Sequence, residues 1–318
     1  MSSPATPAPT PASTVEGRAV PAVVGTSHGG RRGRRLVAGA ASLLGVVPFG
    51  LLVTFFLVIP TLVVVIGSFL DADNRFTLAN VQGLAEGVVV QAYVRTVWIS
   101  AVTALVGAVL GALLAHAVST APPGGLLRRV VTSVCGVLAQ FGGVTLAFAF
   151  LATFGFTGFV TVWLQQTFGV DPYGAGGWLT DTPGLLLVYT YFQIPLMVVV
   201  FLPALDGLRP QWREATESLG GSTWAYGRHV GGPVLLPSFL GGALLLFANA
   251  FSAYATAKAL VSQGSPIVPL KIDAAISGEV VTGQDNIGKA MALGMVVVVA
   301  LVLWLYARLQ RRTSGWLS

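Results

Sequence analysis

The sequence predicts an all-α polytopic membrane protein with six transmembrane helices. Hydrophobic residues make up 54% of its 318 residues and charged residues only 9%, whereas about 25% of an ordinary soluble domain is charged. Several charge-free runs reach the roughly 20 residues that a helix needs to cross about 30 Å of hydrocarbon. We therefore expect the chain to fold in a bilayer.

The N-terminal region predicts a disordered tail followed by the first span. Its first residues are rich in Pro, Ala, Ser, Thr and Gly, so they bury too little apolar surface to offset the entropy of ordering. We assign residues 1–45 to a disordered cytoplasmic tail. The arginines at 31–35 suggest a secretory signal, but the charge-free run after them extends to Leu70 and is too long for a cleaved signal core. The first span is therefore placed at 47–70.

Five further spans are predicted from charge-free runs that end near arginine, proline or glycine. They lie at 94–117, 130–153, 183–204, 234–257 and 287–307. The third ends at 153 because Gly155 and Gly158 interrupt the run and leave a trailing piece that is too short to cross. That piece contains Trp163, and tryptophan favours the headgroup level, so we expect an interfacial segment there.

The distribution of basic residues predicts which side each segment faces. Most of the 18 Lys and Arg residues fall in the N-terminal tail, after the second span, in the loop at 206–233 and near the C-terminus. Basic segments favour the cytoplasmic side, so both termini are expected to be cytoplasmic. The membrane portion is then 46–312, followed by a short tail at 313–318. Topology accounts for the positive charge, and no nucleic acid partner is expected.

Acidic residues gather in the segments that are predicted to lie outside. A solvated rim would explain them, and so would a docking surface for an external solute-binding protein. These residues are Asp71, Asp73, Glu86, Asp171, Asp181, Asp273, Glu279 and Asp285.

The loop after the fourth span has the local signals of two short helices. Pro210 suits the first turn of a helix because its missing N–H would have no partner there. Gly220 can take the left-handed conformation that ends a helix, and Ser222 can cap a second helix. We predict a first helix at 210–219 and a second that ends at 231–233, where the chain re-enters the membrane.

The same loop carries a specific spacing. Glu214 and Ala215 are adjacent, Gly220 follows six positions after the glutamate, and Val230 and Pro233 stand ten and thirteen positions after the glycine. This pattern resembles the EAA motif in the permease subunits of binding-protein-dependent ABC importers.

The resemblance implies a fold, a function and partners. In a permease of the type I importer fold, this loop docks on a separate ABC ATPase subunit, and the glutamate at the position of Glu214 contacts that subunit. The assembly also contains a second permease subunit and an external solute-binding protein, in the bacterial plasma (inner) membrane. Thr216 replaces the usual second alanine and Gly232 stands where leucine is common, but the glutamate and the glycine turn are kept.

The solute is less well defined by the sequence. The segments 76–80 and 247–259 resemble the spermidine/putrescine, phosphonate and iron(III) branch of these permeases, which implies a small polar solute such as a polyamine or a phosphonate. Sugar permeases share the same loop and are the alternative. No Asp or Glu lies deep in a predicted span, so a fixed anionic site for a cation is not expected within the membrane.

Four polar side chains within the predicted spans are candidates for the translocation pathway. They are Gln140, Gln193, Asn249 and Tyr254, and such groups are costly unless they face another helix or a wet cavity. As contacts between helices, amides contribute about 0.6 kcal/mol each. As pathway residues they would meet the solute, and we expect Gln140, Gln193 and Asn249 to converge on one central cavity.

Other function classes are less well supported. The spans contain no G-x-S-x-G, no H-E-x-x-H and no paired acids, so an intramembrane enzyme is not expected. The chain lacks G-x-x-x-x-G-K-[ST], so it is expected to bind no cofactor and to depend on a partner that hydrolyses ATP. Its three histidines lie far apart, which predicts no metal site. An ion-coupled secondary transporter would usually need ionisable groups at midmembrane, and none is evident.

Overall fold

The computed structural model describes residues 47–71, 73–122, 124–174, 176–261, 267–277 and 285–313. The expected N-terminal tail, the C-terminal tail after Thr313 and the predicted outer residue Glu279 lie outside these ranges. The chain divides into two compact units, residues 1–59 and 60–318. In the first unit the described part is helical from Val47 and includes a π-helical turn, η1, at Thr54–Val58.

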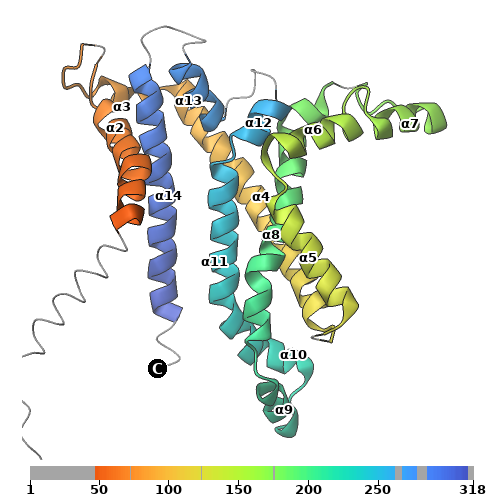
Figure 1. Cartoon of the computed structure of the whole chain (residues 1–318). Helices are drawn as coiled ribbons and strands as arrows, with labels where there is room; N and C mark the ends of the chain where they lie inside the picture. The colour runs from red at the N-terminus through yellow and green to blue at the C-terminus, as the bar shows by residue number, and fades with distance from the viewer. Residues whose placement is uncertain are drawn as a thin grey trace, which may run out of the picture. The chain divides into compact units, whose positions relative to one another are not determined.

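The elements that follow are helical (Figure 1). The first set is α2 (Ile59–Gly67), α3 (Ala79–Gly83), α4 (Gly87–Ser119), α5 (Leu126–Gln140), α6 (Gly143–Phe154), α7 (Phe159–Phe168), the 3-10 turn η2 (Trp178–Thr180) and α8 (Thr182–Asp206). The second set is α9 (Pro210–Ser218), α10 (Thr223–Tyr226), the π-helical turn η3 (Gly227–Gly231), α11 (Gly232–Phe251), α12 (Ala255–Leu260), α13 (Val268–Ile276) and α14 (Asp285–Thr313). Within the described ranges, β pairing is limited to an isolated bridge between Leu70 and Phe76.

Six helical segments are long and apolar enough to cross a membrane, which confirms the predicted number of spans. Length and composition identify them as Val47–Gly67, Gly87–Ser119, Gly143–Phe168, Thr182–Asp206, Thr223–Phe251 and Asn286–Arg308. Five of the six overlap the predicted spans closely. The chain is therefore an all-α, multi-pass membrane protein.

The third predicted span, 130–153, is wrong as a single helix. The structure breaks it at Phe141 and Gly142, so α5 ends at Gln140 and α6 begins at Gly143. Gly143 has a φ of +67°, a conformation that side chains with a Cβ rarely adopt and that stops the preceding helix from continuing. The predicted interruption at Gly155–Gly158 is present, and in Figure 1 α6 and α7 run in a different direction from α5.

The long helices α4 and α8 pack together along most of their length because small residues line the contact. Gly107 and Gly111 are one turn apart on α4. A Cβ at Gly111 would lie 2.5 Å from Met197 Cβ and 2.7 Å from the Ile194 carbonyl oxygen, so only glycine permits this approach. Close packing of backbones at small residues is a main source of helix association in membranes.

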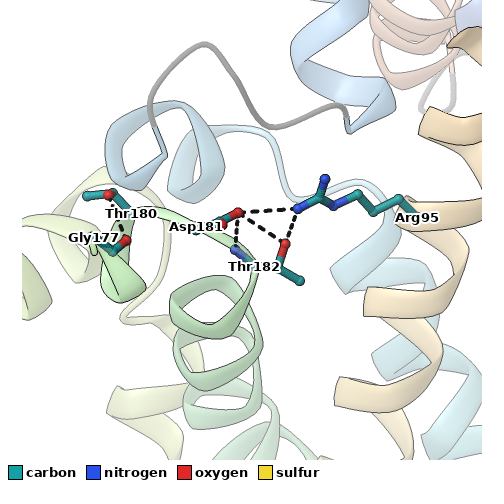
Figure 2. Close-up of polar contacts among 5 residues, drawn as sticks. All are labelled: Arg95, Gly177, Thr180, Asp181 and Thr182. Carbon is teal, nitrogen blue, oxygen red and sulfur yellow. Dashed lines mark hydrogen bonds and ion pairs between the residues drawn. The ribbon is translucent and has the colours of Figure 1, made fainter. Parts of the chain in front are cut away.

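A polar clamp joins the start of α8 to α4, at the end of α8 opposite α9 (Figures 1 and 2). The Asp181 carboxylate caps α8 by accepting a hydrogen bond of 2.7 Å from the Thr182 N–H. Arg95 of α4 donates to the same carboxylate over 3.2 Å and also to the Thr182 hydroxyl. The clamp thus fixes the lateral position of the α8 N-terminus against α4.

Candidate functional site

The loop between α8 and α11 forms a helical projection, here called the knob, which comprises residues 210–231. Its first helix, α9, begins with Pro210 in its first turn, as predicted. It ends in a Schellman turn, in which the Gly221 N–H donates to the Thr216 carbonyl over 2.9 Å and the Gly220 N–H to the Glu217 carbonyl over 3.0 Å. Gly220 has the left-handed φ of +78° that this turn requires.

The second half of the knob begins at the predicted cap but does not end where the sequence predicts. Ser222 Oγ accepts a hydrogen bond of 3.3 Å from the Ala225 N–H at the start of α10. The predicted end at 231–233 is wrong, because α10 continues through η3 directly into α11. Pro233 lies in the first turn of α11, and the wider π-helical turn before it ends with a bond from the Gly232 N–H to the Gly227 carbonyl. The helix therefore passes the proline without a break.

The knob presents large apolar side chains to the surroundings. Leu219, within the Schellman turn, is 89% exposed, and Trp224, in α10 after the turn, is 75% exposed. Glu214 and Ala215 are also exposed on α9. Burying two such side chains against a partner would contribute roughly 2–3 kcal/mol for each.

The remaining two residues of the motif, Val230 and Pro233, lie where the knob joins the membrane portion. Val230 is half-buried in η3, and Pro233 is exposed in the first turn of α11.

Arg213 and Glu217, one turn apart on α9, form an ion pair of 2.9 Å. Since this pair uses the charge of Glu217, Glu214 is the exposed carboxylate that remains for a basic partner.

A cavity of about 400 Å³ lies where two helix breaks meet. One break separates α5 from α6, and the other separates α11 from α12. The lining residues are Ala139, Gln140, Gly142, Gly143, Phe192, Asn249, Ser252, Ala253, Tyr254, Ala255 and Thr256. Amides and hydroxyls supply its polar character, and this lining contains no Asp, Glu, Lys, Arg or His.

The structure brings three of the four candidate pathway residues to this cavity. Gln140, Asn249 and Tyr254 line it, whereas Gln193 is fully buried and its Nε2 donates to Thr103 Oγ1 over 2.9 Å. Gln193 therefore joins α8 to α4 and does not share the cavity with the other two amides. The adjacent residue Phe192 faces the cavity instead.

Several lining residues were not predicted from the sequence. Ser252 and Thr256 flank the break after α11, and Gly142 and Gly143 form the break after α5. The two adjacent glycines were the available signal, since paired glycines within an apolar run can stop a helix.

An ion pair joins the two short helices that follow the cavity. Lys258 Nζ of α12 donates to Asp273 Oδ2 of α13 over 2.6 Å. The hydrogen bond from Lys258 holds the pKa of the Asp273 carboxyl below its usual 3.8, and a hydrogen bond from Tyr254 acts in the same direction. Tyr254 thereby connects the cavity wall to this ion pair.

Acidification is expected to loosen α12 and α13. Because the pKa of Asp273 is lowered in the folded state, the stabilisation is complete above the usual value and is lost as the pH falls below it. Hydrogen–deuterium exchange of the α12 and α13 peptides, corrected for intrinsic rates, should rise between pH 6 and pH 3. Lys258→Met should show the higher exchange already at pH 6 and little further change. An equal acid response in both proteins would contradict the assignment.

Comparisons with known proteins agree with this geometry. No family model matches the sequence. The chain is 24% identical over 271 residues to the putative ferric transport system permease protein FbpB 1 of Haemophilus influenzae, which covers 83% of this chain and 40% of that protein. It is 26% identical over 182 residues to the thiamine transport system permease protein ThiP of Escherichia coli, covering 55% and 32%. The chain thus spans about two fifths or less of the length of these relatives.

A solved structure shares the fold over most of the chain. It is a crystal structure of a bacterial ABC transporter involved in the import of the acidic polysaccharide alginate, with a TM-score of 0.73 and 16% identity. The match covers 89% of this chain and 99% of the other. The chain therefore has the fold of an ABC importer permease and resembles such permeases in sequence.

Proposed function

We propose that this chain, whose fold is that of an ABC importer permease, forms part of a solute pathway and is powered by a separate ATPase subunit. The observation that carries the proposal is the knob. It combines the Glu214, Ala215 and Gly220 spacing with a Schellman turn and two exposed apolar side chains. Such a surface suits docking in a groove of a partner, where apolar anchors and a charged contact provide affinity and orientation.

The continuity of α10 with α11 supports a mechanism of coupling. The helical segment from Thr223 to Phe251 is uninterrupted, and Asn249 near its end lines the cavity. At 1.5 Å per residue, the path from the knob to Asn249 is about 40 Å long. A displacement of the knob by a closing ATPase would therefore move one wall of the cavity without unfolding any segment.

The cavity lining supports a small polar solute. Its amides and hydroxyls can hydrogen-bond to a solute, and no charged side chain in the lining would hold an ion permanently. Relatives that resemble the chain are named for ferric and thiamine transport. We propose a small polar solute of the kind carried by the spermidine/putrescine, phosphonate and iron(III) permeases, such as a polyamine or a phosphonate. A sugar is the second candidate.

The proposal also specifies the assembly. The chain would bind no nucleotide and would not be an enzyme; ATP would be used by the partner ATPase. A second permease subunit would complete the pathway, and an external solute-binding protein would deliver the solute. The protein would lie in the bacterial plasma membrane with both termini and the knob in the cytoplasm.

Co-purification of the ATPase tests this proposal. The tagged full chain is purified in mild detergent from its own membranes, and a bound subunit with a nucleotide-binding P-loop is identified by mass spectrometry. Glu214→Ala and Trp224→Ala should each reduce the ATPase recovered at least tenfold. The matched control is Trp304→Ala, since Trp304 is 54% exposed on α14 and lies outside the knob.

Two results would contradict the proposed function. One is equal recovery of the ATPase with Trp224→Ala and Trp304→Ala. The other is solute uptake by the purified chain in vesicles, driven by an ion gradient without any ATPase subunit. The second result would favour a secondary transporter.

A further inference from the structure

A second cavity lies between α5 and α8, on the side of the first cavity that is nearer to the knob. Its volume is about 560 Å³. The residues that line it are Thr132, Gly136, Val198, Val199, Leu202, Pro203, Asp206 and Gly207. All of them belong to α5, to α8 or to the residue that follows α8.

The two cavities lie on the same faces of α5 and α8. On α5, Gln140 lines the first cavity and Gly136 and Thr132 line the second, and residues four apart share one face of a helix. On α8, Phe192 lines the first cavity and Val199 the second. Seven residues are two helical turns, so these side chains also share a face and lie about 10 Å apart along the helix.

The second cavity is apolar along its length and polar at the end nearest the knob. Asp206 lines this end and forms an ion pair with Arg128 of α5, whose side chain is 16% exposed. Arg128 and Asp206 lie outside the predicted spans 130–153 and 183–204, next to the predicted cytoplasmic loop 206–233, and the Asp206 side chain is 42% exposed. This end of the cavity therefore opens at the aqueous edge of the membrane portion, where charged groups are stable.

We propose that the α5–α8 seam, defined by the lining of this second cavity, is the route by which the solute leaves the first cavity toward the knob. The Arg128–Asp206 ion pair stands at its exit. This inference rests on the proposed function, because it assigns the exit of the same pathway. The seam receives a polar solute in water, and its apolar walls give that solute few places to bind on the way out.

Cysteine accessibility tests the seam. Cys135, the only cysteine of the chain, is buried and is replaced by serine. Single cysteines are then placed at Thr132 and Val199 in the seam and at Val134 as the control. Val134 is 48% exposed and lies two residues from both Thr132 and Gly136, on the opposite face of α5.

The probe is a membrane-impermeant methanethiosulfonate applied to inside-out vesicles that contain the full chain and its co-expressed ATPase. Thiolates form in water and not in hydrocarbon, so Thr132→Cys and Val199→Cys should react at least tenfold faster than Val134→Cys. Equal rates, or faster reaction of Val134→Cys, would overturn the assignment and indicate that lipid or a partner occupies the seam.

A plug in the seam tests its continuity with the first cavity. Nothing lies within 4 Å of a Cβ placed at Gly136, so a leucine side chain can enter the cavity without displacing a neighbour. Gly136→Leu should slow the labelling of a cysteine at Gln140 at least tenfold, while Gly136→Ala should leave it nearly unchanged. Labelling of that cysteine at the same rate in both variants would refute a continuous route.

A cysteine at Leu219 separates failure of this inference from failure of the proposed function. Leu219 lies at the exposed tip of the knob, so Leu219→Cys must react in inside-out vesicles if the knob is cytoplasmic. Reaction at Leu219 without reaction in the seam would overturn the exit route alone. No reaction at Leu219 would overturn the proposed topology, and the exit route with it.

Discussion

Replacing Gly184 with alanine is expected to prevent the chain from accumulating in a folded form. A Cβ at Gly184 would lie 1.8 Å from the Leu179 carbonyl oxygen and 2.4 Å from its carbon. These atoms belong to the backbone of the η2 turn, which cannot rotate away as a flexible side chain can. Overpacking typically costs about 1–3 kcal/mol and occasionally more. Because the contacts here are to rigid backbone atoms, we expect a cost at the upper end of that range, and the first turn of α8 would be displaced.

The consequence extends to the clamp between α4 and α8. Gly184 is buried in the same turn that holds Asp181 as the cap of α8 and as the partner of Arg95. Fluorescence-detected size-exclusion chromatography should show a loss of the monodisperse peak for Gly184→Ala. The matched control, Gly136→Ala, adds the same methyl group in open space and should keep the peak and a similar melting temperature. A monodisperse, equally stable Gly184→Ala protein would show that the turn has another conformation.

Replacing Gly220 with valine is expected to separate the chain from its ATPase while leaving the membrane portion folded. The φ of +78° at Gly220 costs a β-branched residue about 1–2 kcal/mol. Nothing lies within 4 Å of a Cβ at this position, so any effect comes from the backbone and not from a collision. The population of the Schellman turn should fall about tenfold, and recovery of the ATPase should fall with it.

Asparagine at the same position provides the control, because it tolerates the left-handed conformation. Gly220→Asn should recover most of the ATPase that the wild type recovers, and Gly220→Pro should recover the least, since proline fixes φ near −65° and removes the N–H that bonds to Glu217. All three variants should share the melting temperature of the wild type. Equal losses for asparagine and valine would indicate that the exposed side chain, not the turn, disturbs docking.

The features that the sequence predicts well have strong local causes. Charge-free runs identify five spans closely because the bilayer requires a fixed length of apolar helix. The knob follows from residues whose backbone preferences are specific: Pro210 at the start of α9, Gly220 at its end and Ser222 as the cap of α10.

The errors arise where glycine or proline has two possible outcomes. Glycine is common in transmembrane helices. The pair Gly142 and Gly143 therefore does not by itself predict that α5 ends at Gln140. Proline ends many helices but is also tolerated in a first turn, and Pro233 takes the second role after the π-helical turn η3.

The sequence also did not predict the rotation of α8 about its own axis. The apolar residues of α8 occur on every face of the helix. No stripe of polar residues therefore indicates which face meets the cavity. One residue changes the direction of a side chain by about 100°. Phe192 therefore reaches the cavity while Gln193 meets Thr103 of α4, a difference that only packing decides.

Because the helix from Thr223 to Phe251 is uninterrupted, the two halves of the knob are connected to the membrane portion in different ways. The α10 half is one body with α11, the helix that carries Asn249 at the cavity. The α9 half instead follows α8, the helix that carries Phe192 on another side of the same cavity, through the short segment 207–209. The Schellman turn thus joins two helical paths that lead to different walls of one cavity, so that under the proposed function a movement of the knob would reach both walls.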